Sequence, residues 1–139
     1  MGRVLHETKI AIVVRADLAT WQKLNVTAYL ASALAAGREG LIGEPYEDAS
    51  GQRYLAMFGL PVLVFGAAAG ELDLIRRRCA DRQLPVAIFT DELFSTDNDV
   101  ANRAAVRAVA SGKLTLAGLA VHDRRATVDK VLKGLRLHP

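Results

Sequence analysis

The sequence has almost no cysteine and no long hydrophobic run. Its single cysteine, Cys79, leaves no intramolecular disulfide and no multi-cysteine metal site in the 139 residues. Charged residues recur throughout, so no stretch approaches the roughly 18 uninterrupted apolar residues of a membrane span. The first apolar run stops at Arg15, which is too early for a secretory signal. We therefore expect a cytoplasmic protein with no membrane association, no metal site and no cofactor.

Several common catalytic signatures are also missing. The chain contains no GxxxxGK[ST] loop, GxGxxG fingerprint, HExxH helix or GxSxG elbow. Nucleotide hydrolysis, dinucleotide binding, zinc proteolysis and serine hydrolysis therefore lose their usual sequence support. The net charge of +3 is compatible with an anionic partner, but small basic proteins without such a partner are common.

Short apolar runs alternate with helical patterns along the whole chain. This alternation predicts an α/β fold, in which one small mixed, mostly parallel four-stranded sheet is flanked by helices on both faces. Residues 1–139 are long enough for one substantial core and too short for two ordinary domains, so we expect a single domain. The predicted strands are 10–14, 62–65, 86–89 and 114–121, and the predicted helices are 21–37, 70–83, about 99–110 and 126–132.

The segment 38–61 interrupts this alternation. It is rich in glycine, proline and polar residues, and it also carries Tyr46, Tyr54 and Met57. We expect an irregular excursion with a short hairpin. The excursion is either a lid that covers a pocket together with Trp21, or a loop that packs its aromatic side chains on the core and contacts nothing else.

Polar residues follow the predicted strands at the points where binding groups gather in α/β folds. Arg15 and Asp17 follow the first strand, Thr90 and Asp91 the third, and His122 the fourth. If these ends converge, they supply a cation, carboxylates and an imidazole for acid/base chemistry. The same residues also fit purely structural roles: Arg15 with Asp17 as a local ion pair, Asp17 as a helix cap and Thr90 with Asp91 as a turn.

Part of the sequence resembles a known family. The run KIAIVVRADL at 9–18, the strand at 62–65 and the segment from 85 through LTLAGLAVHDRRATVDKVLKGLRLH resemble type-two peptidyl-tRNA hydrolases over about three quarters of the chain. Within that superfamily, DLATWQKLNV and IGEPYEDASGQRYLAMFG look most similar to its branch called domain of unknown function 2000.

The resemblance implies a catalytic pair, a tRNA partner and a homodimer. Asp91 matches the catalytic-region aspartate of the hydrolases, and Lys23 stands in for one lysine of their GKGK-type run. Trp21 and Leu24 replace other residues of that region, and Ala28 lies about where the family has a glutamine. The sequence departs from the hydrolase pattern where the chemistry should be.

These observations favour a small-ligand-binding or regulatory protein on a peptidyl-tRNA hydrolase-like scaffold. The alternatives are a divergent peptidyl-tRNA hydrolase that uses Asp91 and Lys23, and an enzyme with other small-molecule chemistry. The partner we expect is a small molecule, with tRNA as the alternative, together with a second copy of the chain. The residues predicted to contact the ligand are Arg15, Asp17, Trp21, Asn25, Tyr46, Thr90 and His122.

Overall fold

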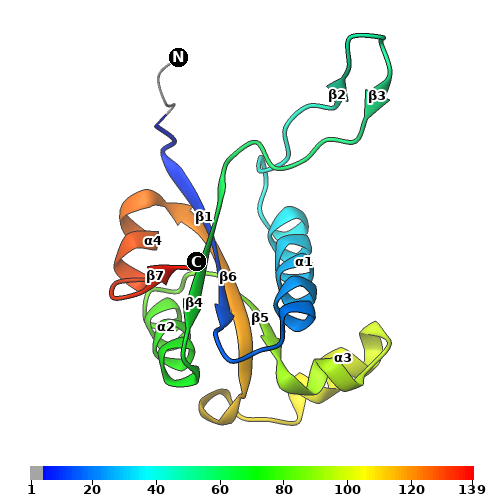
Figure 1. The fold of residues 1–139 in the computed structure, drawn as a ribbon. Helices are drawn as coiled ribbons and strands as arrows, with labels where there is room; N and C mark the ends of the chain where they lie inside the picture. The colour runs from blue at the N-terminus through cyan, green and yellow to red at the C-terminus, as the bar shows by residue number, and fades with distance from the viewer. Residues whose placement is uncertain (1–4) are drawn as a thin grey trace.

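A computed structural model describes residues 5–139 and contains a five-stranded mixed sheet with four α-helices. The strands follow the order β5-β6-β1-β4-β7 (Figure 1). They are β1 (Thr8–Arg15), β4 (Val62–Ala67), β5 (Ala87–Thr90), β6 (Leu116–Arg124) and β7 (Arg136–Leu137). The helices are α1 (Thr20–Gly37), α2 (Ala69–Asp81), α3 (Asp99–Arg107) and α4 (Arg125–Val131), with short 3₁₀ helices η1 (Asp91–Ser95) and η2 (Ser111–Lys113).

The sheet differs from the prediction in strand number and in pairing. Among the described residues, one neighbouring pair is parallel, β1 with β4, whereas β6 runs antiparallel to both β1 and β5, and β7 runs antiparallel to β4. The expected four-stranded, mostly parallel sheet was therefore wrong. The chain after α3 returns directly beside β5, and the two-residue β7 is too short to produce an apolar pattern in the sequence.

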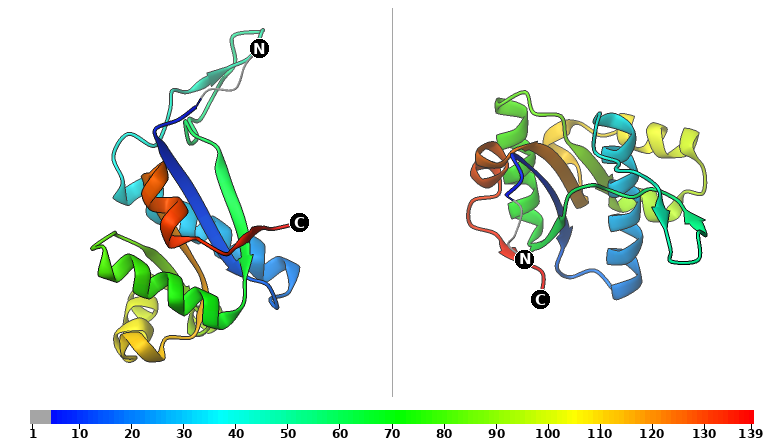
Figure 2. Two further views of the ribbon diagram at one scale, coloured as in Figure 1. Left: turned by 90° about the vertical axis from the view of Figure 1, so that its left-hand side faces the viewer. Right: turned by 90° about the horizontal axis from the view of Figure 1, so that it is seen from above.

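Two core clusters lie against the sheet. Val13 of β1 belongs to a cluster with Leu72 of α2 and Val128 of α4, whereas its neighbour Ile12 belongs to a cluster with Leu30 of α1. Successive side chains of a strand point to opposite faces, which accounts for this division. The views in Figure 1 and Figure 2 place α1 on one side of β1 and α2 with α4 on the other.

Helix α1 has the predicted bounds but buries a different face. The apolar pattern that predicts the helix includes Trp21 and Leu24, which are 62% and 67% exposed. The buried side chains are Val26, Leu30 and Leu34, spaced by four residues. Both sides of the helix are apolar, so spacing alone did not identify the side that packs on the sheet.

The other helices follow the prediction closely. Cys79 on α2 is fully buried. Asp123 lies within β6, and α4 begins two residues later at Arg125. None of the described helices is long and apolar enough to cross a membrane.

The excursion forms a hairpin that projects beyond the end of the sheet (Figures 1 and 2). Its strands are β2 (Tyr46–Glu47) and β3 (Arg53–Tyr54), paired antiparallel. Every residue from 42 to 55 is exposed. The excursion is thus neither a lid over Trp21 nor a loop that packs its tyrosines on the core, because Tyr46 and Tyr54 face each other across an isolated ladder.

Candidate functional site

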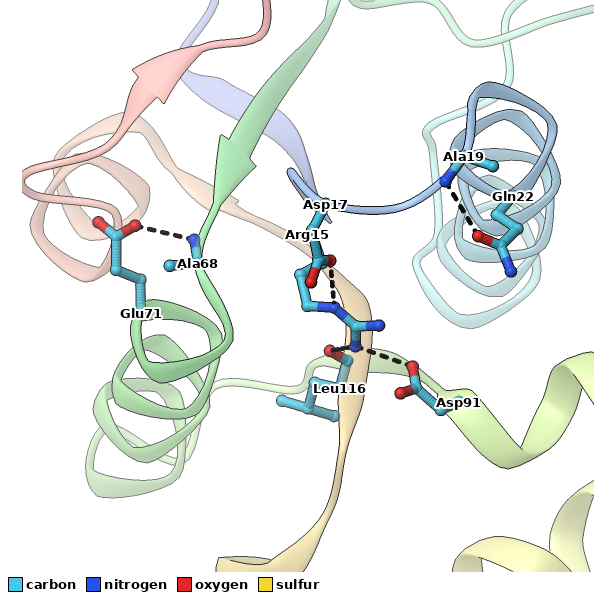
Figure 3. A network of polar contacts seen from close by, with 8 residues as sticks. All are labelled: Arg15, Asp17, Ala19, Gln22, Ala68, Glu71, Asp91 and Leu116. Atoms are coloured by element: carbon cyan, nitrogen blue, oxygen red, sulfur yellow. Dashed lines mark hydrogen bonds and ion pairs between the residues drawn. The ribbon is translucent and has the colours of Figure 1, made fainter.

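Arg15 is the centre of a polar network at one edge of the sheet (Figure 3). Its Nε donates to an Asp17 carboxylate oxygen at 2.7 Å, and its Nη1 donates to an Asp91 carboxylate oxygen and to the Leu116 carbonyl, both at 2.8 Å. The Arg15 side chain is largely buried, whereas Asp91 is partly exposed and Asp17 mostly exposed. The hydrogen bond that Arg15 donates to Asp91, opposed by partial burial, raises the pKa of Arg15.

The strand directions explain why these residues meet. β1 and β5 each run antiparallel to β6, which lies between them, so the ends carrying Arg15 and Asp91 fall at the same edge. β6 begins at that edge, which brings the Leu116 carbonyl within reach of the guanidinium. Because both neighbouring carboxylates already neutralise Arg15, the network is not an open site for an anion.

Thr90 ends β5 and Lys23 lies in the first turn of α1, but neither side chain bonds to the Arg15 network among the described residues. Thr90 is buried, and its hydroxyl has no hydrogen-bond partner among residues 5–139. The Lys23 amine lies 3.1 Å from Nε2 of His138. Within the described residues, Lys23 makes no hydrogen bond or ion pair with Asp91, so the two residues that the resemblance pairs are not in direct contact.

His122 lies away from the Arg15 network. β6 is antiparallel to β1, so His122 pairs with Ile10 near the opposite edge of the sheet. Nε of Arg38 donates to His122 Nδ1 at 3.4 Å, which leaves the proton of a neutral imidazole on Nε2, and that atom has no partner among the described residues. Burial and the charge of Arg38 lower the pKa of His122, and Asp123 partly offsets this.

Trp21 and Asn25 line a cavity of about 440 Å³ between α1, η1 and the start of α3. A chain of aromatic contacts forms its wall. The ring centroids of Trp21 and Phe94 are 5.9 Å apart, those of Phe94 and Phe89 are 5.0 Å apart, and those of Phe89 and Tyr29 are 5.6 Å apart. Edge-on and tilted contacts of this kind hold the rings in fixed orientations, which leaves a preformed apolar wall.

Polar groups from the η1–α3 segment also line this cavity. The Asn98 side chain accepts from the Ala101 amide at 2.8 Å, which caps α3, and its amide donates to Asp97 at 3.0 Å. The Thr96 hydroxyl bonds to the side chain of Asn102. Asp97 makes no ion pair with any described residue, whereas Asp99 pairs with Arg103.

A second, more apolar cavity of about 560 Å³ continues from the first between α1 and α3. It adds Val106, Arg103 and Arg107 of α3 to the lining. We call the two cavities together the α1–α3 groove. Both are lined by Tyr29, Phe89, Leu93, Asp99 and Asn102.

The structure brings only part of the predicted ligand-contact set into this groove. Trp21 and Asn25 line it, while Tyr46 lies on the distant hairpin and His122 near the other edge of the sheet. Sequence reasoning missed the η1–α3 residues. The available signal was an aromatic residue, Phe94, followed at once by the polar cluster 95–99.

Residues 5–139 contain no group of three or more His, Cys, Asp or Glu side chains arranged to hold a metal ion.

Comparison with known proteins gives a family and one close structural relative. Residues 8–139 match the family described as "Protein of unknown function (DUF2000)". A solved structure described as a protein of unknown function, Atu0240 from Agrobacterium tumefaciens strain C58, is 37% identical, with a TM-score of 0.94. The match covers 97% of this chain and 100% of that one. No curated protein is significantly similar to the chain.

Proposed function

Since the chain belongs to the DUF2000 family, whose description assigns no activity, we propose a function from its own groove: it binds a small organic molecule between α1 and α3. The ligand has a flat or apolar body and a protonated amine. One observation carries this proposal, namely that aromatic side chains line the same cavity as a carboxylate, Asp97, that has no cationic partner among the described residues.

The aromatic wall favours this ligand chemistry in two ways. Flat apolar groups gain by burial against rings whose positions are already fixed, so little ordering cost is added on binding. A cation over the face of an indole or phenyl ring is attracted by its quadrupole, by about 0.5–1 kcal/mol at an exposed site. Trp21 is half exposed at the mouth, where it can contact such a ligand.

The charged side chains that line the first cavity favour a cationic ligand over an anionic one. Asp97 and Asp99 both line the first cavity, and among residues 5–139 the only cation that pairs with either is Arg103, which lines the second cavity. Arg15, predicted to contact the ligand, is already held by two carboxylates. An anionic ligand would therefore meet like charge in this cavity.

The proposal is tested with ligands that share one body and differ in charge. We would titrate phenethylammonium, 3-phenylpropanol and 3-phenylpropionate into ¹⁵N-labelled protein and follow the amide resonances of α1 and α3. The amine is expected to bind most tightly and the acid most weakly. Binding of the acid as tight as that of the amine, or no saturable change with any of the three, would refute the proposal.

A matched pair of variants localises the interaction. Asp97→Asn is expected to weaken amine binding by about tenfold, which corresponds to ~1.4 kcal/mol. Asp81→Asn removes the same charge from the exposed end of α2 and is expected to leave the affinity unchanged. Equal effects of the two substitutions would show that net charge, rather than the groove, controls binding.

The second candidate function is hydrolysis of peptidyl-tRNA on a type-two peptidyl-tRNA hydrolase-like scaffold. It is favoured by the partly exposed Asp91 held by Arg15 at the strand ends, the position that matches the hydrolase family. In this case Asp91 orients a water and Lys23 stabilises the oxyanion. Such a scaffold is compatible with the two core clusters on β1. It is also compatible with a cytoplasmic location, which the free, buried Cys79 supports.

Release of N-acyl amino acid from N-acyl-aminoacyl-tRNA tests this second candidate. Turnover that is lost in both Asp91→Ala and Lys23→Ala would support it. Absence of turnover at high enzyme concentration would exclude it and leave the ligand-binding proposal in place.

A further inference from the structure

We propose that the projecting hairpin is an exchange arm that docks on a second copy of this chain. The arm comprises residues 42–58. Its counterpart is the basal groove, a cavity of about 690 Å³ at the start of β1 and β4, with Leu63 at its base. The remaining lining residues of the basal groove are Leu5, His6, Thr8, Lys9, Pro61 and Arg125.

The arm is hydrogen-bonded internally but has no core of its own. At its stem, the Gly43 amide donates to the Met57 carbonyl at 2.8 Å. At its tip, Asp48 accepts from the Ser50 amide and the Tyr54 hydroxyl, at 2.9 and 2.7 Å. A two-stranded hairpin without a packed face is marginally stable at best in water. A surface that covers the arm would therefore stabilise it.

The arm carries a large apolar surface for its size. Leu55 is 88% exposed and Met57 59%, and Ile42, Tyr46 and Tyr54 are about half exposed. At roughly 100 Å² of exposed side chain each, they offer on the order of 500 Å² per protomer. Because Tyr54 and Leu55 are successive residues and point to opposite faces, one docked face buries about half of this area. Two exchanged arms and the surfaces beneath them would then bury roughly 1,000 Å², the lower limit for a specific interface.

An arm cannot reach the basal groove of its own chain. Its stem is anchored on the α1 side, where Leu41 is buried and Phe58 and Leu60 pack against the same cluster. The basal groove lies on the other side, because Leu63 pairs with Ala11, whose side chain belongs to the α2–α4 cluster. Arm and groove nevertheless lie at the same end of the sheet, as Figure 2 shows for the arm. With a two-fold axis at that end of the sheet, the arm of each protomer would lie in the basal groove of the other.

Charge complementarity identifies the occupant as a second copy. The arm carries the carboxylates of Glu44, Glu47 and Asp48 against a single cation, Arg53. The basal groove is lined by three basic residues and by no acidic residue. Of these, Lys9 is paired with Asp129, and the Arg125 Nε donates to the His6 carbonyl, which leaves the other guanidinium nitrogens for a partner.

Light scattering coupled to size-exclusion chromatography tests the exchange. The full chain is expected to be a dimer, and Leu55→Glu is expected to raise the dimer dissociation constant on the order of a hundredfold or more, because the change occurs twice in a symmetric interface. The control Leu24→Glu places the same charge on an equally apolar, exposed position of α1 and should leave the dimer intact.

Hydrogen exchange and a charge reversal complete the test. The Gly43 and Gly59 amides of the stem should exchange slowly in the full chain and rapidly in Leu55→Glu. Arg125→Glu should weaken the dimer, and adding Glu47→Arg should restore part of the loss. A monomeric full chain, a Leu55→Glu dimer of unchanged affinity, or a dimer broken by Leu24→Glu instead would overturn the proposal.

Discussion

Replacing Gly118 with alanine should destabilise the protein strongly, although it adds only one methyl group. Gly118 lies on β6 beneath α1, and a Cβ there would come within 2.7 Å of a Val26 methyl, 2.8 Å of the Val13 carbonyl oxygen and 3.1 Å of a Leu30 methyl. The carbonyl belongs to the β1 backbone and cannot move without disturbing the β1–β6 ladder. Relieving all three contacts therefore requires α1 to shift away from the sheet and the β1–β6 ladder to distort locally.

The expected cost of this shift is about 2–3 kcal/mol, the usual range for overpacking a core. For a domain of this size it lowers Tm by roughly 6–12 °C. Urea unfolding followed by far-UV circular dichroism measures the free energy directly, provided that the slope with denaturant stays constant. Because α1 carries Trp21 and Asn25, the same substitution should also weaken ligand binding in the α1–α3 groove.

The matched control is Gly70→Ala in α2. A Cβ at Gly70 meets nothing within 4 Å, so the substitution is expected to stabilise the protein by up to about 1 kcal/mol through helix propensity. The same chemical change should thus have opposite signs at the two positions. If Gly118→Ala leaves the free energy of unfolding unchanged, or if both variants lose stability equally, the close approach of α1 to β6 is not as described.

Three further predictions follow from the titratable groups. Burial lowers the pKa of His122 below 6.5, so the stability that neutral His122 contributes is complete above pH 6.5 and is lost as pH falls through the folded pKa. In the His122→Gln variant, the free energy of unfolding should therefore fall less across that pH window. Burial raises the pKa of Cys79 to about 11, so labelling by iodoacetamide at neutral pH should be slow in the native protein and fast in urea. Asp91→Asn should lower the free energy of unfolding by about 1 kcal/mol and Asp17→Asn by less than about 0.5 kcal/mol, because Asp17 is the more exposed partner of Arg15. Thermal unfolding measures both values, and a larger loss for Asp17→Asn would contradict this ranking.

Local patterns in the sequence identified most elements, but not how the strands pair. Apolar runs and helix stops placed β1, α1, β4, α2 and β5 within a few residues of their observed bounds. Strand direction depends on where the chain goes after a helix, and apolar runs look alike in parallel and antiparallel strands. The assumption that each helix connects parallel strands fails at β6, which returns antiparallel beside β5.

The wrong direction assumed for β6 also explains why only part of the site was predicted. Arg15 and Asp91 meet because β1 and β5 do run in the same direction, as expected from alternating strands and helices. His122 was placed with them only because β6 was assumed to run that way too, and its reversal puts His122 beside Arg38 instead. The groove lining from η1 and α3 depends on the position of α3 relative to α1, which no local pattern encodes.

Tryptophan fluorescence measures ligand binding in the α1–α3 groove most directly, because Trp21 is the only tryptophan of the chain and lines that groove. Titration with phenethylammonium should give a saturable change in emission that is much weaker with 3-phenylpropionate and is reduced about tenfold in affinity by Asp97→Asn. No saturable change, or a change of equal affinity with the acid and in Asp97→Asn, would contradict a groove that binds small amine-bearing molecules.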